Sequence, residues 1–301
     1  QEATRANLAR TGGARGRAAA HHAGRAARPD RRAAGAGAQE LALLEDQLLR
    51  LAPSVHENTV VVGAGMVKEI HTSTLALFER VLGPTRTSQA VRKARLIFCV
   101  PDASLERPEN PWPYTYTLPE GIGAVSGRTV VNHAGVFCAD RLDIGTRFFL
   151  GHLPDGRDAR RVVDLGCGNG VVGTAMALTS PGAEVLFTDE SFQAVASAEA
   201  TYKANDVPGH AEFRVGDALA GVPAGSVDLV LNNPPFHSHQ RRRTRRRGGC
   251  SPGAAGAAPG GELWVVGNRH LGYHVKLRRV FGNSQLVAGD PKFVVLKAVR
   301  R

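Results

Sequence analysis

The chain has 301 residues, enough for two domains, and 43% of them are hydrophobic, which is ordinary for a globular protein. Its four cysteines (Cys99, Cys138, Cys167 and Cys250) have no paired spacing, which argues against a disulfide framework or a zinc site and for a reducing compartment. Without an apolar run of membrane-spanning length or a signal-peptide core, we expect a monomeric cytoplasmic protein with no membrane or metal partner.

The formal net charge of +11 points to a nucleic-acid partner, but the charge is concentrated in two tracts. Residues 1–38 hold eight arginines and two acids, residues 241–247 hold six arginines, and the rest of the chain is nearly neutral. Residues 1–38 have almost no large apolar side chains, so they are predicted to be disordered. Three interpretations of this tail stay open: a solvated segment, a segment translated out of frame, and an RNA-binding arm or transit-like peptide.

Residues 39–125 are predicted to form an α/β fragment. Leucines at helical spacing predict a helix over 41–51, and a β-branched run predicts a strand over 59–62. Gly63 and Gly65 are interpreted as a turn after that strand; a nucleotide-binding loop is the alternative, but a third glycine and a following acid are missing. The other elements predicted here are a helix over 74–82 and strands over 95–100 and 115–118.

Residues 126–301 alternate strand-like and helix-like segments, which predicts an α/β fold with a parallel, doubly wound sheet. A closing hairpin after a short helix is expected to add an antiparallel strand. Ligands of such sheets bind at the carboxyl ends of the strands. The predicted strands cover 162–164, 184–188, 212–215, 227–231, 263–266, 285–288 and 293–298, and the predicted helices cover 147–153, 171–178, 192–205 and 274–280.

One segment, residues 238–260, does not fit this architecture, which requires a covering helix there. Apart from Cys250, it has no apolar residue larger than alanine, so it cannot form an amphipathic helix that covers a sheet. Order is expected to resume at Gly261. A pair of compensating frame slips would explain a segment of helix length with this composition.

A glycine-rich turn from Val162 to Gly170 marks the predicted cofactor site. A buried strand is predicted to end at Asp164. Gly166, Gly168 and Gly170 follow it and precede an apolar helix. Glycine permits unusual backbone dihedral angles and leaves room for a ligand to approach. Asp164 can organise this turn or contact a cationic group of the ligand.

Two further acids follow the next two predicted strands. Asp189 ends the strand after the glycine turn, where a carboxylate can accept hydrogen bonds from both hydroxyls of a ribose. Asp217 follows the third strand and is placed to accept a hydrogen bond from an adenine amino group. Taken one at a time, each acid could equally be a helix cap or a solvated loop residue, but three at successive strand ends favour a nucleotide site.

The segment Asn233-Pro234-Pro235-Phe236 follows the predicted strand 227–231. Its two prolines stiffen the loop and remove backbone donors, so the Asn233 side-chain oxygen and the Pro234 carbonyl become two fixed acceptors. A planar exocyclic amine can donate to both, and Phe236 can stack on the base that carries the amine, once that base is unstacked from its helix. The structural alternative is a rigid turn.

These motifs resemble those of the class I S-adenosylmethionine-dependent N-methyltransferases. The resemblance becomes narrower at Leu142-Asp143-Ile144-Gly145, in the Gly-Glu-Leu-Trp-Val-Val-Gly-Asn-Arg-His-Leu segment from Gly261, and at 292–299. There the chain is similar to the guanine-N2 methyltransferases of ribosomal RNA, most narrowly those of the large-subunit (23S) RNA, with those of the small-subunit (16S) RNA as a sister group. The resemblance covers residues 39–237 and 261–300.

The resemblance implies a class I methyltransferase, Rossmann-like catalytic domain over 126–301, preceded over 39–125 by part of a degenerate methyltransferase-like domain that helps to hold RNA. It implies ribosomal RNA as partner, S-adenosyl-L-methionine as cofactor, and methyl transfer to the exocyclic N2 amine of a guanine. The implied catalytic residues are Asn233, Pro234, Pro235 and Phe236, and the implied cofactor-binding residues are Asp143, Gly145, Asp164, Gly166, Gly168, Gly170, Asp189, Asp217 and Asn233.

Other functions stay open from the sequence. The chain could act on 16S instead of 23S RNA, or it could be a catalytically weak RNA-binding protein that keeps the methyltransferase fold. Its arginine tracts favour the latter, because arginines contact phosphates and give an affinity that falls with salt. Methylation of adenine N6 or of a protein glutamine would use a similar proline-rich loop.

Overall fold

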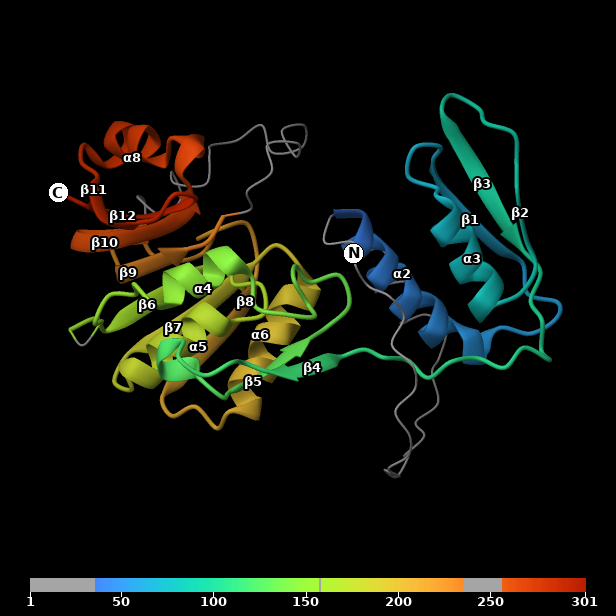
Figure 1. Cartoon of the computed structure of the whole chain (residues 1–301), viewed down its shortest axis with the longest axis horizontal. Coiled ribbons are helices and arrows are strands. Elements are labelled where there is room, and N and C mark those ends of the chain that lie inside the picture. Colours follow the sequence, from blue (N-terminus) through green and yellow to red (C-terminus); the bar gives the residue numbers. More distant parts are fainter. Residues whose placement is uncertain (1–35, 157, 235–255) are drawn as a thin grey trace. The chain divides into compact units, whose positions relative to one another are not determined.

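The computed structural model describes most of the chain (Figure 1). Among the described residues, no helix combines the length and the apolar character needed to cross a bilayer. The predictions for Pro235, Phe236 and most of the segment 238–260 fall outside the described residues, as does nearly all of the predicted tail. The described residues are 36–156, 158–234 and 256–301.

Residues 36–99 form a small antiparallel sheet with two packed helices. Leu48, Phe78 and Val81 from the helices are buried with Ile97 of the central strand in one apolar cluster. The helices predicted over 41–51 and 74–82 and the strand predicted over 95–100 are confirmed. The short strand Thr85–Thr87 could not be predicted, because it contains no apolar residue. The elements are α2 (Ala36–Leu51), the 3-10 helix η1 (Ala52–Ser54), β1 (Val61–Met66), α3 (Thr72–Val81), β2 (Thr85–Thr87) and β3 (Ala94–Cys99).

The predicted turn at Gly63 and Gly65 is wrong, because both glycines lie inside β1, which pairs with β3. A Cβ on Gly63 would lie 3.2 Å from Cζ of Phe78 and 3.3 Å from Cβ of Ile97. A Cβ on Gly65 would lie 3.3 Å from Cγ1 of Ile70. The glycines therefore leave space for neighbouring side chains against the strand, and they form no nucleotide-binding loop.

The C-terminal part holds a seven-stranded sheet with helices between the strands, as predicted, and the closing hairpin is present. A separate two-stranded antiparallel sheet precedes it. The elements are β4 (Tyr114–Thr117), η2 (Gly123–Val125), β5 (Thr129–Asn132), α4 (Ile144–Leu150), β6 (Arg161–Leu165), α5 (Val171–Thr179), β7 (Glu184–Asp189), α6 (Phe192–Ala204), β8 (His210–Val215), β9 (Val227–Asn232), β10 (Ala257–Asn268), η4 (Arg269–Leu271), α8 (Tyr273–Phe281), β11 (Gln285–Gly289) and β12 (Phe293–Val299).

The strand order of the large sheet is β11-β12-β10-β9-β6-β7-β8. Neighbouring strands from β10 to β8 are parallel, and β12 runs antiparallel to both β10 and β11. The chain runs outward from β6 in one direction to β7 and β8, and then in the other direction to β9 and β10. The carboxyl ends of β6 and β9 therefore meet at the point where a doubly wound sheet binds its ligand.

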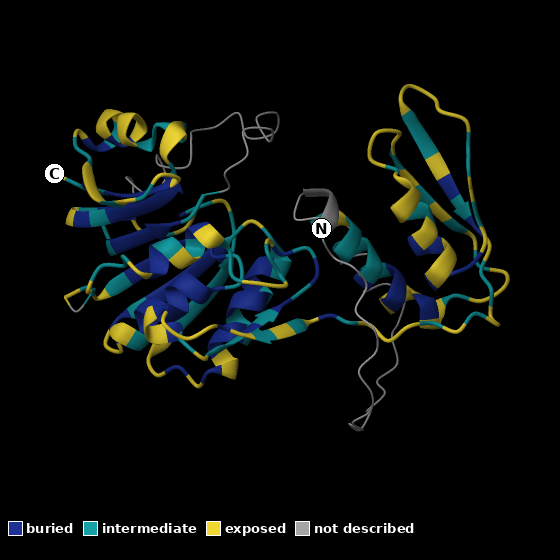
Figure 2. Cartoon of the chain, in the orientation of Figure 1, coloured by how far each residue is buried: buried dark blue, intermediate teal, exposed yellow. Residues whose placement is uncertain are grey.

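The central strands of the sheet are buried on both faces (Figure 2). On one face, Phe149, Met176 and Phe187 belong to a cluster that α4, α5 and α6 cover. On the other face, Leu263 packs with Leu277 of α8. Burial on both faces explains why the central strands are continuous apolar runs rather than alternating ones.

Strand β10 begins at Ala257, four residues before the predicted resumption of order at Gly261. The register with β9 is interrupted between Ala257 and Glu262, and Gly260 has a φ of +80°. Gly260 N donates to the Arg300 carbonyl at 2.8 Å, and Arg300 N donates to the Gly261 carbonyl at 2.9 Å. Backbone hydrogen bonds rather than apolar side chains therefore define the start of this strand, which is why composition does not reveal it.

Helix α6 holds β5 through side chains spaced one turn apart on one face of the helix. They bind alternate backbone N–H groups of β5 and the residue after it, which fixes this strand next to the large sheet. The three bonds are Thr129 N to Asn205 Oδ1 (2.9 Å), Val131 N to Thr201 Oγ1 (3.0 Å) and His133 N to Ser197 Oγ (2.8 Å).

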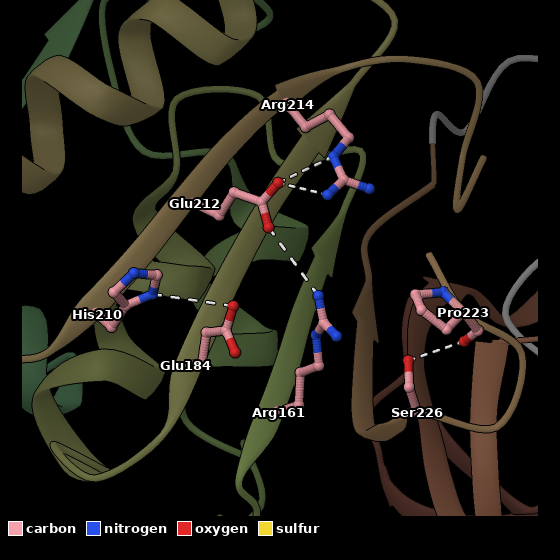
Figure 3. A network of polar contacts seen from close by, with 7 residues as sticks. All are labelled: Arg161, Glu184, His210, Glu212, Arg214, Pro223 and Ser226. Carbon is pink, nitrogen blue, oxygen red and sulfur yellow. Dashed lines mark hydrogen bonds and ion pairs between the residues drawn. The ribbon is translucent and has the colours of Figure 1, made fainter. Parts of the chain in front are cut away.

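Charged side chains of β6, β7 and β8 lie close to one another near the edge of the sheet that β8 forms (Figure 3). Glu212 pairs with Arg214 and lies 4.0 Å from Arg161, while His210 lies 3.9 Å from Glu184. Partly exposed pairs of this kind contribute roughly 0–1 kcal/mol each. Their more general effect is to make the edge strand β8 unsuitable for pairing with another chain.

Candidate active site

The glycine turn after β6 has two different sides. Gly166, Gly168 and Gly170 all have positive φ (+72°, +54° and +76°), which favours glycine. A Cβ on Gly166 or Gly168 would have no heavy atom within 4 Å, whereas one on Gly170 would lie 2.7 Å from the Cα of Ala198 in α6. Gly166 and Gly168 therefore leave open space for a ligand, and Gly170 permits close packing of the helix; its cofactor contact stays a prediction.

Asp164 lies beneath this turn and is 3% exposed. Its Oδ2 accepts a hydrogen bond from the backbone N of Gly173 in the first turn of α5, at 2.8 Å. Burial raises the pKa of Asp164 to about 7, against a smaller opposing effect of the Gly173 bond, and the nearby Asp189 raises it further. Asp164 therefore fixes the strand to the helix, and its predicted contact with the cofactor stays a prediction.

This buried acid predicts a pH dependence of stability. An unfolded Asp164 releases its proton near 3.8, whereas the folded one keeps it up to about pH 7. Raising the pH from 4 to 8 therefore favours unfolding, by up to about 4 kcal/mol from this group. Asp164→Asn cannot ionise and can still accept from Gly173, so it should lose less stability than wild type over that range.

Denaturant unfolding of wild type and Asp164→Asn at pH 5 and pH 8 tests this expectation. Other titrating groups contribute to both proteins, so the difference between the two free energies of unfolding isolates Asp164. A difference that is the same at both pH values would show that Asp164 does not titrate in this window.

Asp189 ends β7 beside the glycine turn, as predicted. Its Oδ2 accepts from Gly168 N at 3.2 Å and its Oδ1 accepts from Ser191 N at 2.9 Å. The Asp189 carbonyl accepts from Gly216 N at 3.0 Å, which brings the exposed Asp217 to the adjacent strand end. Burial raises the pKa of Asp189, against those backbone bonds. Asp189 and Asp217 therefore lie at the carboxyl ends of neighbouring strands. Each carboxylate keeps lone pairs that can accept further hydrogen bonds.

A second group of residues joins α4 to the end of β9. Asp143 caps α4, and its Oδ2 accepts from Thr146 N at 2.9 Å and from Thr146 Oγ1 at 3.3 Å. Thr146 Oγ1 in turn accepts from Asn233 Nδ2 at 2.8 Å. The Asn233 Oδ1 atom is buried and has no hydrogen-bond partner among the described residues. The relay therefore fixes the amide so that its oxygen is the atom left to accept a donor.

Sequence reasoning placed Asp143, Gly145 and Asn233 here but missed Thr146. The helix predicted from residue 147 begins at Ile144, because Asp143 is its N-cap. An aspartate directly before the first apolar residue of a helix is a helix-start signal, and it identifies this cap. Gly145 is buried within the first turn of the helix.

A second missed contact fixes the glycine turn from the side. Asn169 Nδ2 donates to Oδ1 of Asn132 at 3.0 Å. Asn132 ends β5 and is fully buried. The turn is therefore held by β5, by Asp189 and by α5. Among the described residues, no three His, Cys, Asp or Glu side chains lie close enough together to hold a metal.

The chain is similar to known proteins over most of its length. The methyltransferase small domain matches residues 127–297, and the RLMG N-terminal domain matches residues 1–103. Ribosomal RNA large subunit methyltransferase G of Streptomyces coelicolor is 74% identical over 263 residues, which cover 87% of this chain and 70% of the relative. The protein of the same name from Aeromonas salmonicida is 50% identical over 263 residues, covering 86% and 68%.

A solved structure supports the same fold. The T. thermophilus 16S rRNA N2 methyltransferase, in complex with AdoMet and guanosine, matches with a TM-score of 0.71 and 23% identity. The match covers 89% of this chain and 71% of that one. The predicted class I methyltransferase fold is thereby confirmed.

Proposed function

The chain belongs to the family of ribosomal RNA large subunit methyltransferase G, and on that basis we propose that it methylates the N2 amine of a guanine in 23S ribosomal RNA. S-Adenosyl-L-methionine is the methyl donor of the methyltransferase fold it carries. The structural neighbour described as an N2 methyltransferase in complex with guanosine supports the choice of atom and base.

The observation that carries this proposal is the orphaned oxygen of Asn233. It is buried, it has no partner, and the bond from Asn233 Nδ2 to Thr146 determines its orientation. Pro234 follows directly and lacks an N–H, so its carbonyl is the polar group it offers. An exocyclic amine with two N–H bonds matches two acceptors, whereas a hydroxyl or a ring nitrogen does not.

The residues present also fit the cofactor. Gly166 and Gly168 leave open space over the turn, and Asp189 keeps lone pairs for the two hydroxyls of a ribose. Asp217 at the next strand end is exposed and can accept from the adenine amine. When bound, S-adenosyl-L-methionine supplies a methyl group made electrophilic by its sulfonium sulfur.

Catalysis by this chain then consists mainly of holding the amine. Asn233 Oδ1 and the Pro234 carbonyl accept its two N–H bonds, which directs the nitrogen lone pair out of the base plane and away from both acceptors. Positive charge develops on the nitrogen as the new N–C bond forms, so the same two acceptors stabilise the transition state more than the ground state. The surplus proton leaves afterwards, to water or to a carboxylate.

The division of labour along the chain is part of the proposal. Residues 39–125 would help to hold RNA, and residues 126–301 would bind the cofactor and catalyse the transfer. The family matches over 1–103 and 127–297 support a boundary in this region. Strands β4 and β5 pair with each other across the predicted boundary at residue 125. Because helix α6 binds β5 and the residue after it through three hydrogen bonds, this strand pair is attached to the catalytic domain.

Methyl transfer from labelled cofactor to unmodified 23S and 16S RNA tests the proposed function. We expect label in N2-methylguanosine of 23S RNA after digestion to nucleosides, and much less with Asn233→Ala. Label only in 16S RNA would reassign the substrate to the small subunit. Binding of RNA and cofactor with no transfer would support the scaffold alternative.

Thr146 gives a more selective test of the relay. Thr146→Val keeps the shape of the side chain but removes the acceptor for Asn233 Nδ2, so the amide can rotate and present its N–H₂ to the substrate. We expect kcat to fall about tenfold, which corresponds to roughly 1.4 kcal/mol. Thr146→Ser keeps the hydroxyl and should stay near wild type. Equal activity of the Val and Ser variants would show that the relay does not orient Asn233.

A further inference from the structure

A basic pocket lies at the carboxyl end of β10, apart from the residues assigned above to cofactor and target base. It is open, has a volume of about 520 Å³, and is lined by Asn268, Arg269, His270, Pro291 and Lys292. This volume is in the range of pockets that hold small ligands. Asn268 ends β10, Arg269 and His270 belong to η4, and Pro291 and Lys292 lie in the turn between β11 and β12.

The cations of the pocket keep free donors. Arg269 donates from Nε and Nη2 to the Asp290 carbonyl, at 3.1 and 2.6 Å, which fixes the guanidinium and leaves Nη1 available. The Asp290 carboxylate accepts from the backbone N of Lys292 and of Phe293. Within the described chain, no ion pair joins it to Arg269 or Lys292, although it lies near enough to feel both charges. The Lys292 ammonium lies over the Phe293 ring, 5.1 Å from its centroid.

The positive surface continues onto α8. Tyr273 packs against Gly267, where a Cβ would lie 2.6 Å from its ring, and the Lys276 ammonium is 4.5 Å from the ring centroid. Arg278 and Arg279 of the same helix are exposed. From Leu263 to Gly289 the chain contains no Asp or Glu. The pocket is thus one end of a basic surface, and Asp290 is the acid that lies beside Arg269 and Lys292 there.

Two observations place the pocket beside the predicted base site. Val265 of β10 is opposite Asn232 of β9, so strand geometry puts the Cα of Asn268 about 8 Å from that of Asn233. Helix α4, whose Thr146 binds Asn233, also stacks Phe148 on Phe293 with ring centroids 6.1 Å apart. A nucleotide strand with one base at Asn233 can therefore reach the pocket with a neighbouring nucleotide.

We propose that this pocket binds a backbone phosphate of the substrate RNA adjacent to the target guanine. The inference rests on the proposed function. A base that is turned out of its helix needs its strand fixed next to it, and contacts from arginine and lysine to phosphates supply that position without reading sequence. The planar Arg269 fork, already held by Asp290, suits phosphate oxygens.

The pocket also has a feature suited to ribose. The Asn268 side-chain oxygen is buried without a hydrogen-bond partner. Turning the carboxamide toward a ribose 2′-hydroxyl would satisfy it, and the 2′-hydroxyl is the group that distinguishes RNA from DNA. The proposed ligand is therefore a ribonucleotide phosphate rather than any anion.

Filter binding of unmodified 23S RNA to the full chain, over a series of KCl concentrations, tests the proposal with Lys292→Gln. We expect three- to tenfold weaker binding at low salt, and a slope of log affinity against log salt that is flatter by about 0.7. In methyl transfer, KM for RNA should rise by the same factor with kcat within twofold. Lys203→Gln is the matched control, because Lys203 is equally exposed but lies on α6 and pairs with Glu199.

The outcomes separate this inference from the proposed function. Wild-type methylation of RNA together with a Lys292→Gln variant that matches Lys203→Gln in affinity, slope and KM would overturn the pocket. Absence of wild-type methylation would overturn the proposed function, whereas the salt slopes would still test the pocket. With Asn268→Ala, the preference for RNA over DNA of the same sequence should fall; an unchanged preference would remove the ribose contact from the proposal.

Discussion

Replacing Asn233 by alanine is expected to lower kcat for guanine methylation by about 10²- to 10³-fold. The variant removes the acceptor oxygen that is buried without a partner and that the Thr146 bond orients. Loss of one preorganised group at the site where charge develops typically costs 10²–10³ in kcat, or about 2.7–4 kcal/mol. The Pro234 carbonyl remains, so residual activity should be measurable.

Asn233→Asp provides the comparison. It retains an acceptor oxygen at the same place, and the Thr146 hydroxyl can turn to donate to it, so the loss should be smaller than in Asn233→Ala. Single-turnover methyl transfer at saturating cofactor and RNA measures the chemical step, and calorimetry measures cofactor affinity. If Asn233→Ala and Asn233→Asp lose activity equally, the acceptor role assigned to this oxygen is wrong.

The glycine turn and the acids at the neighbouring strand ends could be predicted because their signals are local in sequence. A strand that ends in a glycine-rich turn, and acids at the ends of the next strands, follow from residue type and spacing alone. The structure puts Gly166 and Gly168 over open space and Asp189 beside them. The structure also distinguishes the three glycines, which the sequence pattern could not do. Gly170 permits close packing on Ala198, whereas Gly166 and Gly168 leave open space.

The contacts that position the site could not be predicted, because they join residues distant in sequence. Thr146 meets Asn233 across 87 positions, and Asn132 meets Asn169 across 37. The same limitation explains the error at Gly63, where a glycine pattern looks alike in a turn and in a strand. The pairing of β1 with β3 and the position of Phe78 against Gly63 show that it lies in a strand.

Asp189→Ala is expected to weaken binding of S-adenosyl-L-methionine by about one to two orders of magnitude or more. Its carboxylate is proposed to accept from the ribose hydroxyls, and each charge-assisted bond is worth roughly 1.5–3 kcal/mol. The variant also leaves Gly168 N without its acceptor, so the turn proposed to bind the cofactor loses one of its supports. Calorimetric titration with cofactor measures the change directly, and tenfold corresponds to about 1.4 kcal/mol.

A matched aspartate makes this test specific, because any loss of a carboxylate that binds backbone could loosen the fold. Asp228 has the same exposure class as Asp189 and also accepts two backbone N–H bonds, from Arg160 and Arg161, both at 2.9 Å. It lies near the start of β9, at the amino ends of the parallel strands, whereas the glycine turn lies at their carboxyl ends. Asp228→Ala should therefore lower thermal stability while leaving cofactor affinity within twofold of wild type. Equal losses of affinity in the two variants would trace the effect to the fold and not to a ribose contact at Asp189.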